Sequence, residues 1–212
     1  MSAANGNAED APLLLGFGGN AWNAANVALN LHDLFPDAEV VVFHYRGYWL
    51  SAGRPSAEAL LTDSLQIFEQ LRPGRARAVV AVGFSIGCGV AAYLAQHRPL
   101  AGMILFTPFD SLEALAREHY WWAPVGLLLR HQMPTIDFIR HTSLPTAFIS
   151  AGRDAVVPLR RSEPLRLAIP NLIFDRMITD SGHNDLYDHP AFKGAMREAL
   201  ARIEAAAGRP VC

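Results

Sequence analysis

The chain has 212 residues, of which 51% are hydrophobic and 18% are charged, and its formal net charge is −2. This length and composition predict one globular domain spanning residues 1–212, and the charge gives no electrostatic basis for binding nucleic acid or an anionic membrane. The two cysteines, Cys88 and Cys212, are far apart, which argues against a disulfide framework and favours a reducing compartment.

The N-terminal residues do not have the pattern of a signal peptide. Residues 1–11 are small, polar and acidic, without the basic start and apolar core of a signal peptide. Further along, the apolar run Val125 to Leu129 is far too short to span a membrane. We therefore expect a soluble, cytoplasmic protein, although a chain from which an N-terminal anchor had been removed would look the same.

Short apolar runs alternate with stretches of helical spacing along the whole chain. The expected strands are residues 12–15, 39–44, 78–82, 102–107, 146–150 and 172–177. The expected helices are residues 23–34, 56–71, 86–97, 159–167 and 190–206, with two more in the segment 112–143. This alternation predicts an α/β fold with a doubly wound, mostly parallel six-stranded sheet and helices on both faces. Ligands of such sheets bind beyond the carboxyl ends of the strands.

The central motif is Gly83-Phe-Ser-Ile-Gly87, between an expected buried strand and a helix rich in glycine and alanine. A serine on so abrupt a strand-to-helix turn must take a strained backbone conformation, and the two glycines remove the collisions that side chains would cause there. The turn is expected to raise the Ser85 hydroxyl above the sheet and to place the Ile86 amide beside it. This pattern predicts a nucleophile elbow. The nearby Cys88 is interpreted as a small core residue of the helix.

A serine nucleophile needs a general base, and eight histidines compete for that role. His183 follows the last expected strand inside a glycine-containing turn, from which a flexible loop can lower an imidazole onto Ser85. His44, at the end of an earlier strand, is the second candidate. The others lie beside turns, on helix surfaces or in the segment 112–143: His32, His97, His119, His131, His141 and His189.

The base in turn needs an acid that orients it. Asp154 lies in a Gly-Arg-Asp turn after the fifth expected strand, and Asp110, after the fourth, is its rival. Asp180 and Asp185 flank His183, but sequence neighbours rarely face each other across a hydrogen bond. The order Ser85, Asp154, His183 is the chain order expected of hydrolases built on this elbow.

Three motifs together, Gly-Phe-Ser-Ile-Gly, Gly-Arg-Asp-Ala-Val-Val-Pro and Ser-Gly-His-Asn-Asp-Leu, resemble the α/β-hydrolase superfamily. The segments from Tyr45 to Ser56, from Gly19 to Asn23 and from Trp122 to Arg130 are similar to its bud-emergence-type and serine-aminopeptidase-like branch. The resemblance covers residues 13–200. It implies a minimal α/β-hydrolase fold with the strands in the spatial order second, first, third, fourth, fifth, sixth.

The same resemblance implies a catalytic triad of Ser85 as nucleophile, His183 as base and Asp154 as orienting acid. It assigns the two oxyanion-hole amides to Asn20 and Ile86. Family members usually carry His-Gly before the first of these residues, whereas this chain has Gly18-Gly19. The missing imidazole is expected to leave the oxyanion loop less braced.

Two other classes of function remain open. Gly16-Phe-Gly-Gly-Asn-Ala21 also fits the dinucleotide fingerprint, and Arg46 could suit the 2′-phosphate of NADP, but this interpretation leaves the serine, aspartate and histidine motifs unexplained. A non-catalytic binding protein on a decayed hydrolase frame is the other alternative. The hydrolase interpretation needs no cofactor, and no metal is indicated, because the histidines lack ligand spacing and no Cys-x-x-Cys occurs.

The substrate is expected to be a small-molecule carboxylic ester with a short to medium acyl chain. All four tryptophans, Trp22, Trp49, Trp121 and Trp122, fall in segments expected at the carboxyl edge. Of these, Trp22, Trp121 and Trp122 are candidate lining residues of an acyl pocket. The segment 112–143 is expected to form a small helical lid, too short to be a large cap. Thioesters and small amides stay open, and the sequence does not indicate an oligomeric state.

Overall fold

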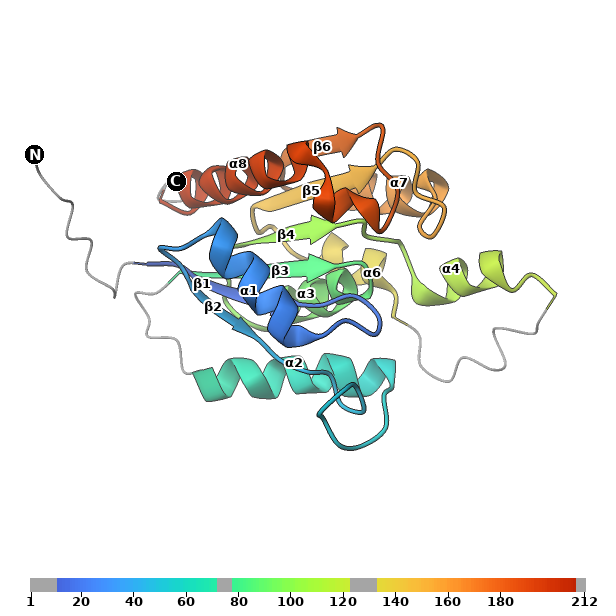
Figure 1. Ribbon diagram of the computed structural model, residues 1–212, viewed down its shortest axis with the longest axis horizontal. Helices are drawn as coiled ribbons and strands as arrows, with labels where there is room; N and C mark the ends of the chain where they lie inside the picture. The colour runs from blue at the N-terminus through green and yellow to red at the C-terminus, as the bar shows by residue number, and fades with distance from the viewer. Residues whose placement is uncertain (1–10, 72–77, 123–132, 209–212) are drawn as a thin grey trace, which may run out of the picture.

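In the computed structural model, which describes residues 11–71, 78–122 and 133–208, six strands form one parallel sheet (Figure 1). Their order is β2-β1-β3-β4-β5-β6, as the family resemblance implied. The strands are β1 (Leu13–Phe17), β2 (Glu39–Val42), β3 (Val79–Phe84), β4 (Gly102–Phe106), β5 (Thr146–Ala151) and β6 (Leu172–Ile178). All residues of β1, β3, β4 and β5 are buried, as expected of parallel strands covered on both faces.

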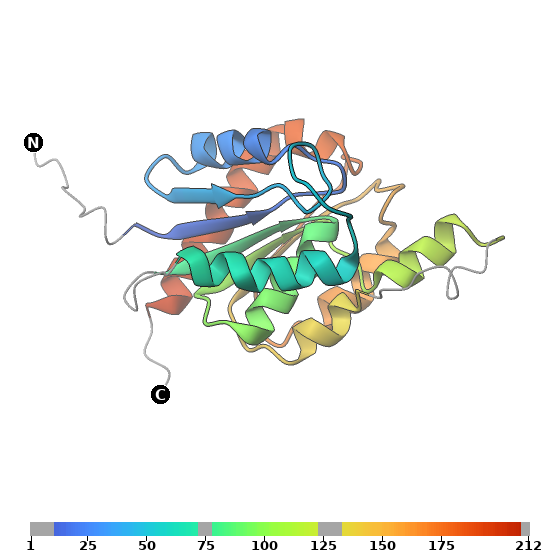
Figure 2. The same ribbon diagram turned by 90° about the horizontal axis from the view of Figure 1, so that it is seen from below.

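Helices cover both faces of the sheet (Figures 1 and 2). On one face, α1 (Ala24–Leu34) and α8 (Pro190–Ala207) pack their apolar side chains against the strands. The other face is covered by α2 (Ala57–Leu71), α3 (Ile86–His97), α6 (Thr135–Arg140) and α7 (Leu159–Ala168). The doubly wound architecture predicted from the alternating pattern is therefore confirmed.

The helix starts follow local rules. The Asn23 side chain accepts a hydrogen bond from the Ala25 amide at 2.9 Å, and the predicted cap Ser56 accepts one from the Ala59 amide at 3.0 Å. Strand β2 ends at Val42, two residues before the predicted end at His44, because its hydrogen-bonded pairing with β1 stops at the pair Gly16 and Val42.

The segment 112–143 contains α4 (Leu112–His119) and α6 among the described residues. The run Val125 to Leu129 and most of the block from Trp122 to Arg130 lie outside them, as does Cys212. We call residues 112–122 the α4 arm, because they extend away from the sheet (Figure 1). No helix in the described ranges is long and apolar enough to cross a membrane.

Polar contacts attach the α4 arm to the start of α7 and to the loop that precedes it. Glu118 pairs with Arg160 and, at 3.4 Å, with Arg161. His119 Nε2 lies 2.7 Å from the Val156 carbonyl oxygen, to which it can donate. Beneath these contacts Leu115 packs in a small cluster with Phe109 and Val157. Among the described residues, these contacts attach the middle of the arm, at Leu115, Glu118 and His119, to the rest of the domain.

Candidate active site

Ser85 occupies the strained turn that the sequence predicted. It connects β3 to α3 with φ 52° and ψ −114°, in a region that non-glycine residues rarely adopt, and its side chain is half-buried. A Cβ added at Gly87 would lie 2.1 Å from the Phe17 carbonyl oxygen, and one at Gly83 would lie 2.7 Å from the Cys88 Cα. Both glycines are therefore required for steric reasons, and the backbone around the serine is closely packed.

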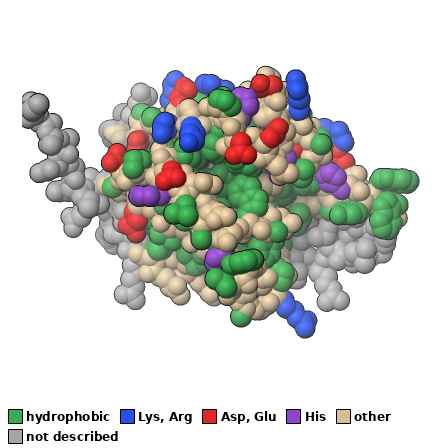
Figure 3. Space-filling model, in the orientation of Figure 1, with side chains coloured by type: hydrophobic (Ala, Val, Ile, Leu, Met, Phe, Trp, Pro, Cys, Tyr) green, Lys and Arg blue, Asp and Glu red, His purple; other side chains and the backbone are tan. Residues whose placement is uncertain are grey.

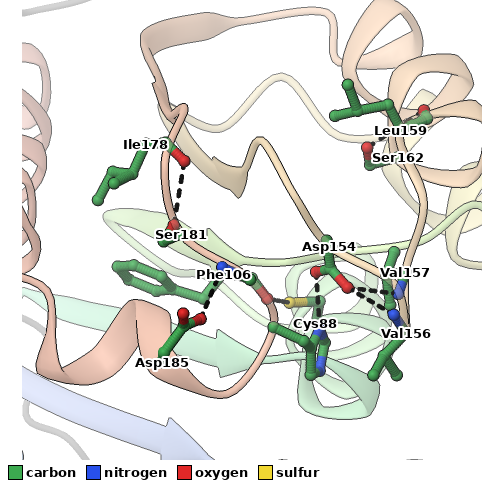
Figure 4. A network of polar contacts seen from close by, with 12 residues as sticks. Cys88, Phe106, Asp154, Val156, Val157, Leu159, Ser162, Ile178, Ser181 and Asp185 are labelled. Atoms are coloured by element: carbon green, nitrogen blue, oxygen red, sulfur yellow. Dashed lines mark hydrogen bonds and ion pairs between the residues drawn. The ribbon is translucent and has the colours of Figure 1, made fainter.

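The elbow is also attached to the neighbouring strand. The Ser85 amide donates to the Phe106 carbonyl oxygen at the end of β4, at 2.9 Å. Cys88 Sγ lies 3.1 Å from the same Phe106 oxygen (Figure 4). It also lies 3.2 Å from the Gly83 carbonyl oxygen. Burial raises the pKa of the Cys88 thiol, so this group stays protonated. Cys88 is thus a structural residue of the elbow and not a rival nucleophile.

The loops after β5 and β6 bring an imidazole and a carboxylate together. His183 Nδ1 lies 2.7 Å from Asp154 Oδ2, and the exposed fractions of these side chains are 9% and 2%. The other carboxylate oxygen of Asp154 accepts hydrogen bonds from the amides of Val156 at 2.9 Å and Val157 at 2.6 Å (Figure 4). Three hydrogen bonds therefore fix this carboxylate, which can hold the imidazole in one tautomer.

The rival acids are engaged elsewhere. Asp110 pairs with Arg161 at 3.2 Å and accepts from the Ser111 amide. Asp185 accepts from the Gly182 amide at 2.6 Å, and Asp180 lies 3.1 Å from His189 Nε2. Of the four candidate acids, Asp154 is thus the one that contacts His183.

The loop that carries His183 is held more firmly than the sequence suggested. The Arg153 amide donates to the Ser181 carbonyl oxygen at 2.9 Å, which ties the acid loop to the base loop. The short 3₁₀ helix η1 (Asp185–Asp188) then places the Tyr187 ring 5.9 Å from Phe84, the residue before Ser85. His183, Asp154 and the Ser85 elbow therefore lie at the carboxyl edge of the sheet, in segments that follow β6, β5 and β3. The second candidate base, His44, has a buried Nδ1 with no hydrogen-bond partner among the described residues.

Two tyrosines brace the loop that contains Asn20. Tyr45 Oη donates to the Gly18 carbonyl oxygen at 3.0 Å, and Tyr48 Oη donates to Asn20 Oδ1 at 2.6 Å. Burial raises the pKa of both phenols, which keeps them protonated and able to donate. Because Gly18 replaces the family histidine, this loop was expected to be less braced. The structure corrects this expectation, since the brace comes from the loop after β2.

The same loop approaches the start of α3, where the Ile86 amide lies. The carbonyl oxygens of Phe17 and Gly18 would fall 2.1 Å and 2.8 Å from a Cβ at Gly87, so the two backbones are in direct contact. The first amides of a helix have no intrahelical partner, and they point out of its N-terminus. Asn20 thus follows, by two residues, a backbone segment that contacts the start of α3, where the Ile86 amide lies.

The dinucleotide interpretation fits these contacts poorly. Gly16 lies inside β1, with the Val42 side chain 2.7 Å from an added Cβ, whereas the fingerprint needs its first glycine in the turn. Arg46, the expected phosphate ligand, is paired with Asp63. Within the described ranges no group of three or more His, Cys, Asp or Glu side chains could hold a metal ion.

The tryptophans expected in the substrate pocket lie in different places. Trp22 packs on Phe84 and Tyr187 with ring centroids 5.5 and 4.7 Å apart, and it lines a hollow of about 470 Å³ between α1 and the start of α8 (Figure 3). Ser85 does not line this hollow, although its neighbour Phe84 does. Trp121 and Trp122, at the end of the α4 arm, are 84% and 72% exposed and do not line it either.

Comparison with known proteins gives relatives over most of the chain. An uncharacterized protein of Mycobacterium tuberculosis is 34% identical over 200 residues, which cover 89% of this chain and 69% of the relative. The lysophosphatidylserine lipase ABHD12 of Macaca fascicularis is 27% identical, over 78% of this chain and 49% of its own. The α/β-hydrolase domain-containing protein aho-3 of Caenorhabditis elegans is 26% identical, over 86% and 55%. The chain thus spans about half the length of the last two relatives. No protein-family model matches it.

Solved structures share the fold at low identity. A thermophilic esterase from Thermogutta terrifontis superposes with a TM-score of 0.65 at 20% identity, covering 91% of this chain and 90% of the esterase. At this identity the likeness establishes the architecture, and the chemistry has to be argued from the site.

Proposed function

The chain belongs to the α/β-hydrolase superfamily, and we propose that it is a serine hydrolase that cleaves carboxylic esters through an acyl-enzyme intermediate. The single observation that carries this proposal is the buried 2.7 Å contact between His183 Nδ1 and Asp154 Oδ2, from loops that adjoin the strained Ser85 elbow. A fixed imidazole–carboxylate pair beside an elbow serine is the arrangement that activates a hydroxyl for acyl transfer.

In the proposed reaction Ser85 Oγ attacks the ester carbonyl carbon while His183 Nε2 accepts the hydroxyl proton. Asp154 engages Nδ1, which leaves Nε2 as the nitrogen that faces the reaction. The amides of Asn20 and Ile86 donate to the oxyanion of the tetrahedral intermediate. The protonated imidazole then gives its proton to the departing alkoxide, and an alcohol leaves. Water, deprotonated by the same nitrogen, releases the acid and regenerates the serine hydroxyl.

The substrates we propose are esters with short to medium acyl chains. The name of one similar protein, a lysophosphatidylserine lipase, supports ester cleavage as the reaction type. The same machinery would serve thioesters and small amides, so these remain alternative substrates on the same triad. A panel of p-nitrophenyl esters of increasing acyl length, with a matched thioester and anilide, would rank them by kcat/KM.

A fluorophosphonate probe tests the assignment of the nucleophile. Such probes react with serines activated by a base, so the folded protein should be labelled and Ser85→Ala should abolish the labelling. Ser143→Ala serves as the matched control, because that serine precedes β5 and so lies at the opposite end of this strand from the loop that carries Asp154. Labelling that persists without Ser85 would refute the assignment. A folded protein that is never labelled would instead favour a binding protein on a decayed hydrolase frame.

A further inference from the structure

Exposed apolar side chains of the described residues gather at one end of the molecule. Ten large hydrophobic side chains are exposed, and seven of them lie in segments that follow strands at the carboxyl edge. These seven are Trp49, Leu50, Tyr120, Trp121, Trp122, Val156 and Leu159. The proposed active site lies at the same edge of the sheet. The apolar surface that these side chains expose to water is therefore concentrated near that site.

Tryptophan dominates the most exposed of these positions. Trp121 is 84% exposed, Trp49 is 75% exposed and Trp122 is 72% exposed, although this residue type is highly buried on average. Leu50, beside Trp49, is 83% exposed. The α4 arm carries its tryptophans at the end that extends from the sheet, where hydrophobic side chains gather in Figure 3. At this end of the arm the rings of Trp122 and Tyr120 contact each other, with centroids 6.5 Å apart.

The chemistry of these side chains favours a lipid surface over a protein partner. The indole ring is amphipathic and concentrates at membrane–water interfaces, where its ring meets the acyl boundary and its N–H meets polar groups. The exposed pairs stand on two separate segments, Trp49–Leu50 after β2 and Trp121–Trp122 at the end of the arm. Two separate apolar tips suit insertion into a fluid surface, whereas a protein interface needs a continuous packed centre.

We propose that the protein binds the surface of a zwitterionic phospholipid bilayer through Trp49, Leu50, Trp121 and Trp122. The formal net charge of −2 favours aromatic insertion over attraction to anionic lipid as the source of binding. The proposed site then faces the layer from which an ester could enter it. The entry of an ester from the lipid layer rests on the proposed function, whereas the binding of the protein to the bilayer does not.

Flotation with phosphatidylcholine vesicles tests the surface without any catalysis. The full chain carrying Ser85→Ala should float with the vesicles, and adding salt should not release it. In that background, Trp121→Ala with Trp122→Ala should weaken partitioning at least about tenfold, since binding scales with the apolar area inserted. Trp49→Ala with Leu50→Ala should act in the same direction. The matched control is Leu29→Ala with Leu167→Ala, which removes side chains that are 62% and 71% exposed elsewhere and should change nothing.

Several outcomes would overturn the proposal. The folded protein could remain unbound, the control variant could lose as much binding as the tryptophan variants, or binding could require anionic lipid and disappear in salt. A self-association that the tryptophan substitutions abolish, measured by sedimentation without any flotation, would identify a second copy of the chain as the occupant. Because no readout uses turnover, failure here leaves the fluorophosphonate result on Ser85 unaffected, and the reverse also holds.

Discussion

The Ser85 elbow and the α4 arm lie at the same edge of the sheet and are held in opposite ways. At the elbow, backbone touches backbone, so that even one methyl group at Gly87 would lie 2.1 Å from a carbonyl oxygen. The arm is attached by ion pairs, a histidine contact and the small apolar cluster around Leu115, and its terminal tryptophans are exposed. The difference indicates that groups whose positions decide the chemistry are fixed by packing, whereas the part that faces the surroundings is only anchored.

The largest effect, on kcat, is expected for the carboxylate that contacts His183. Asp154→Asn should lower kcat by about 10⁴-fold, because an amide no longer stabilises the imidazolium and favours the wrong tautomer. Asp110→Asn is the control, since that carboxylate pairs with Arg161 and not with His183. Steady-state hydrolysis of a soluble ester, with circular dichroism as a check on folding, measures both. A larger loss with the Asp110 variant would move the orienting acid to the loop after β4.

The close packing of the elbow can be tested with a pair of glycines. Gly87→Ala should lower the free energy of unfolding by more than about 3 kcal/mol, because the new methyl group displaces the Phe17 and Gly18 backbone. Gly194→Ala adds the same methyl group to α8, where nothing lies within 4 Å, and should raise it by about 0.5–1 kcal/mol. Urea unfolding of both variants gives the comparison. Equal changes in the free energy of unfolding would contradict the close backbone packing described around Gly87.

A smaller effect is expected at the braced loop. Tyr48→Phe keeps the ring but removes the hydroxyl that donates to Asn20. The Asn20 amide, which we propose for the oxyanion hole, should then be held less firmly, and kcat should fall about tenfold, a loss of about 1.4 kcal/mol. KM and the midpoint of unfolding should change little. Tyr93→Phe is the control, because that hydroxyl makes no hydrogen bond with the described residues. If both variants behaved alike, the brace would have no part in turnover.

The smallest effect is expected on the α4 arm. Glu118→Gln weakens the pairs with Arg160 and Arg161, which are partly exposed, so the free energy of unfolding should change by no more than about 1 kcal/mol. Urea unfolding at low and high salt measures it, and the difference from the parent protein should shrink as salt is added. A loss as large as that of Gly87→Ala would remove the contrast between the two regions.

Sequence patterns predicted the fold well because its rules are local or topological. The alternation of apolar runs and helical spacing predicted the parallel sheet, and Ser56 as a helix cap is confirmed. The elbow was predictable because Gly83 and Gly87 stand at fixed offsets from Ser85, and the structure shows why both must lack a side chain.

Contacts between distant segments could not be predicted in the same way. The bonds from Tyr45 and Tyr48 to the oxyanion loop span 27 and 28 residues, and no periodicity signals them. The strained backbone of Thr107, with φ 43°, likewise depends on what packs around the end of β4. The residue type of Trp121 and Trp122 suggested contact with an apolar partner, but the sequence did not indicate whether these side chains would point into a pocket or into solvent. Burial is decided by the three-dimensional arrangement of the arm.

The strand order has a consequence for how the protein is made. After β3, each new strand joins the sheet beside the one made just before it, and the loop with His183 follows the last of them. At roughly 5–20 residues per second, the ribosome adds the residue that we assign as general base about 5–20 s after Ser85. An unfinished chain would therefore carry the serine without the group that activates it. Ribosome-arrested chains exposed to fluorophosphonate should stay unlabelled until that loop has emerged, so translation itself would delay the onset of reactivity.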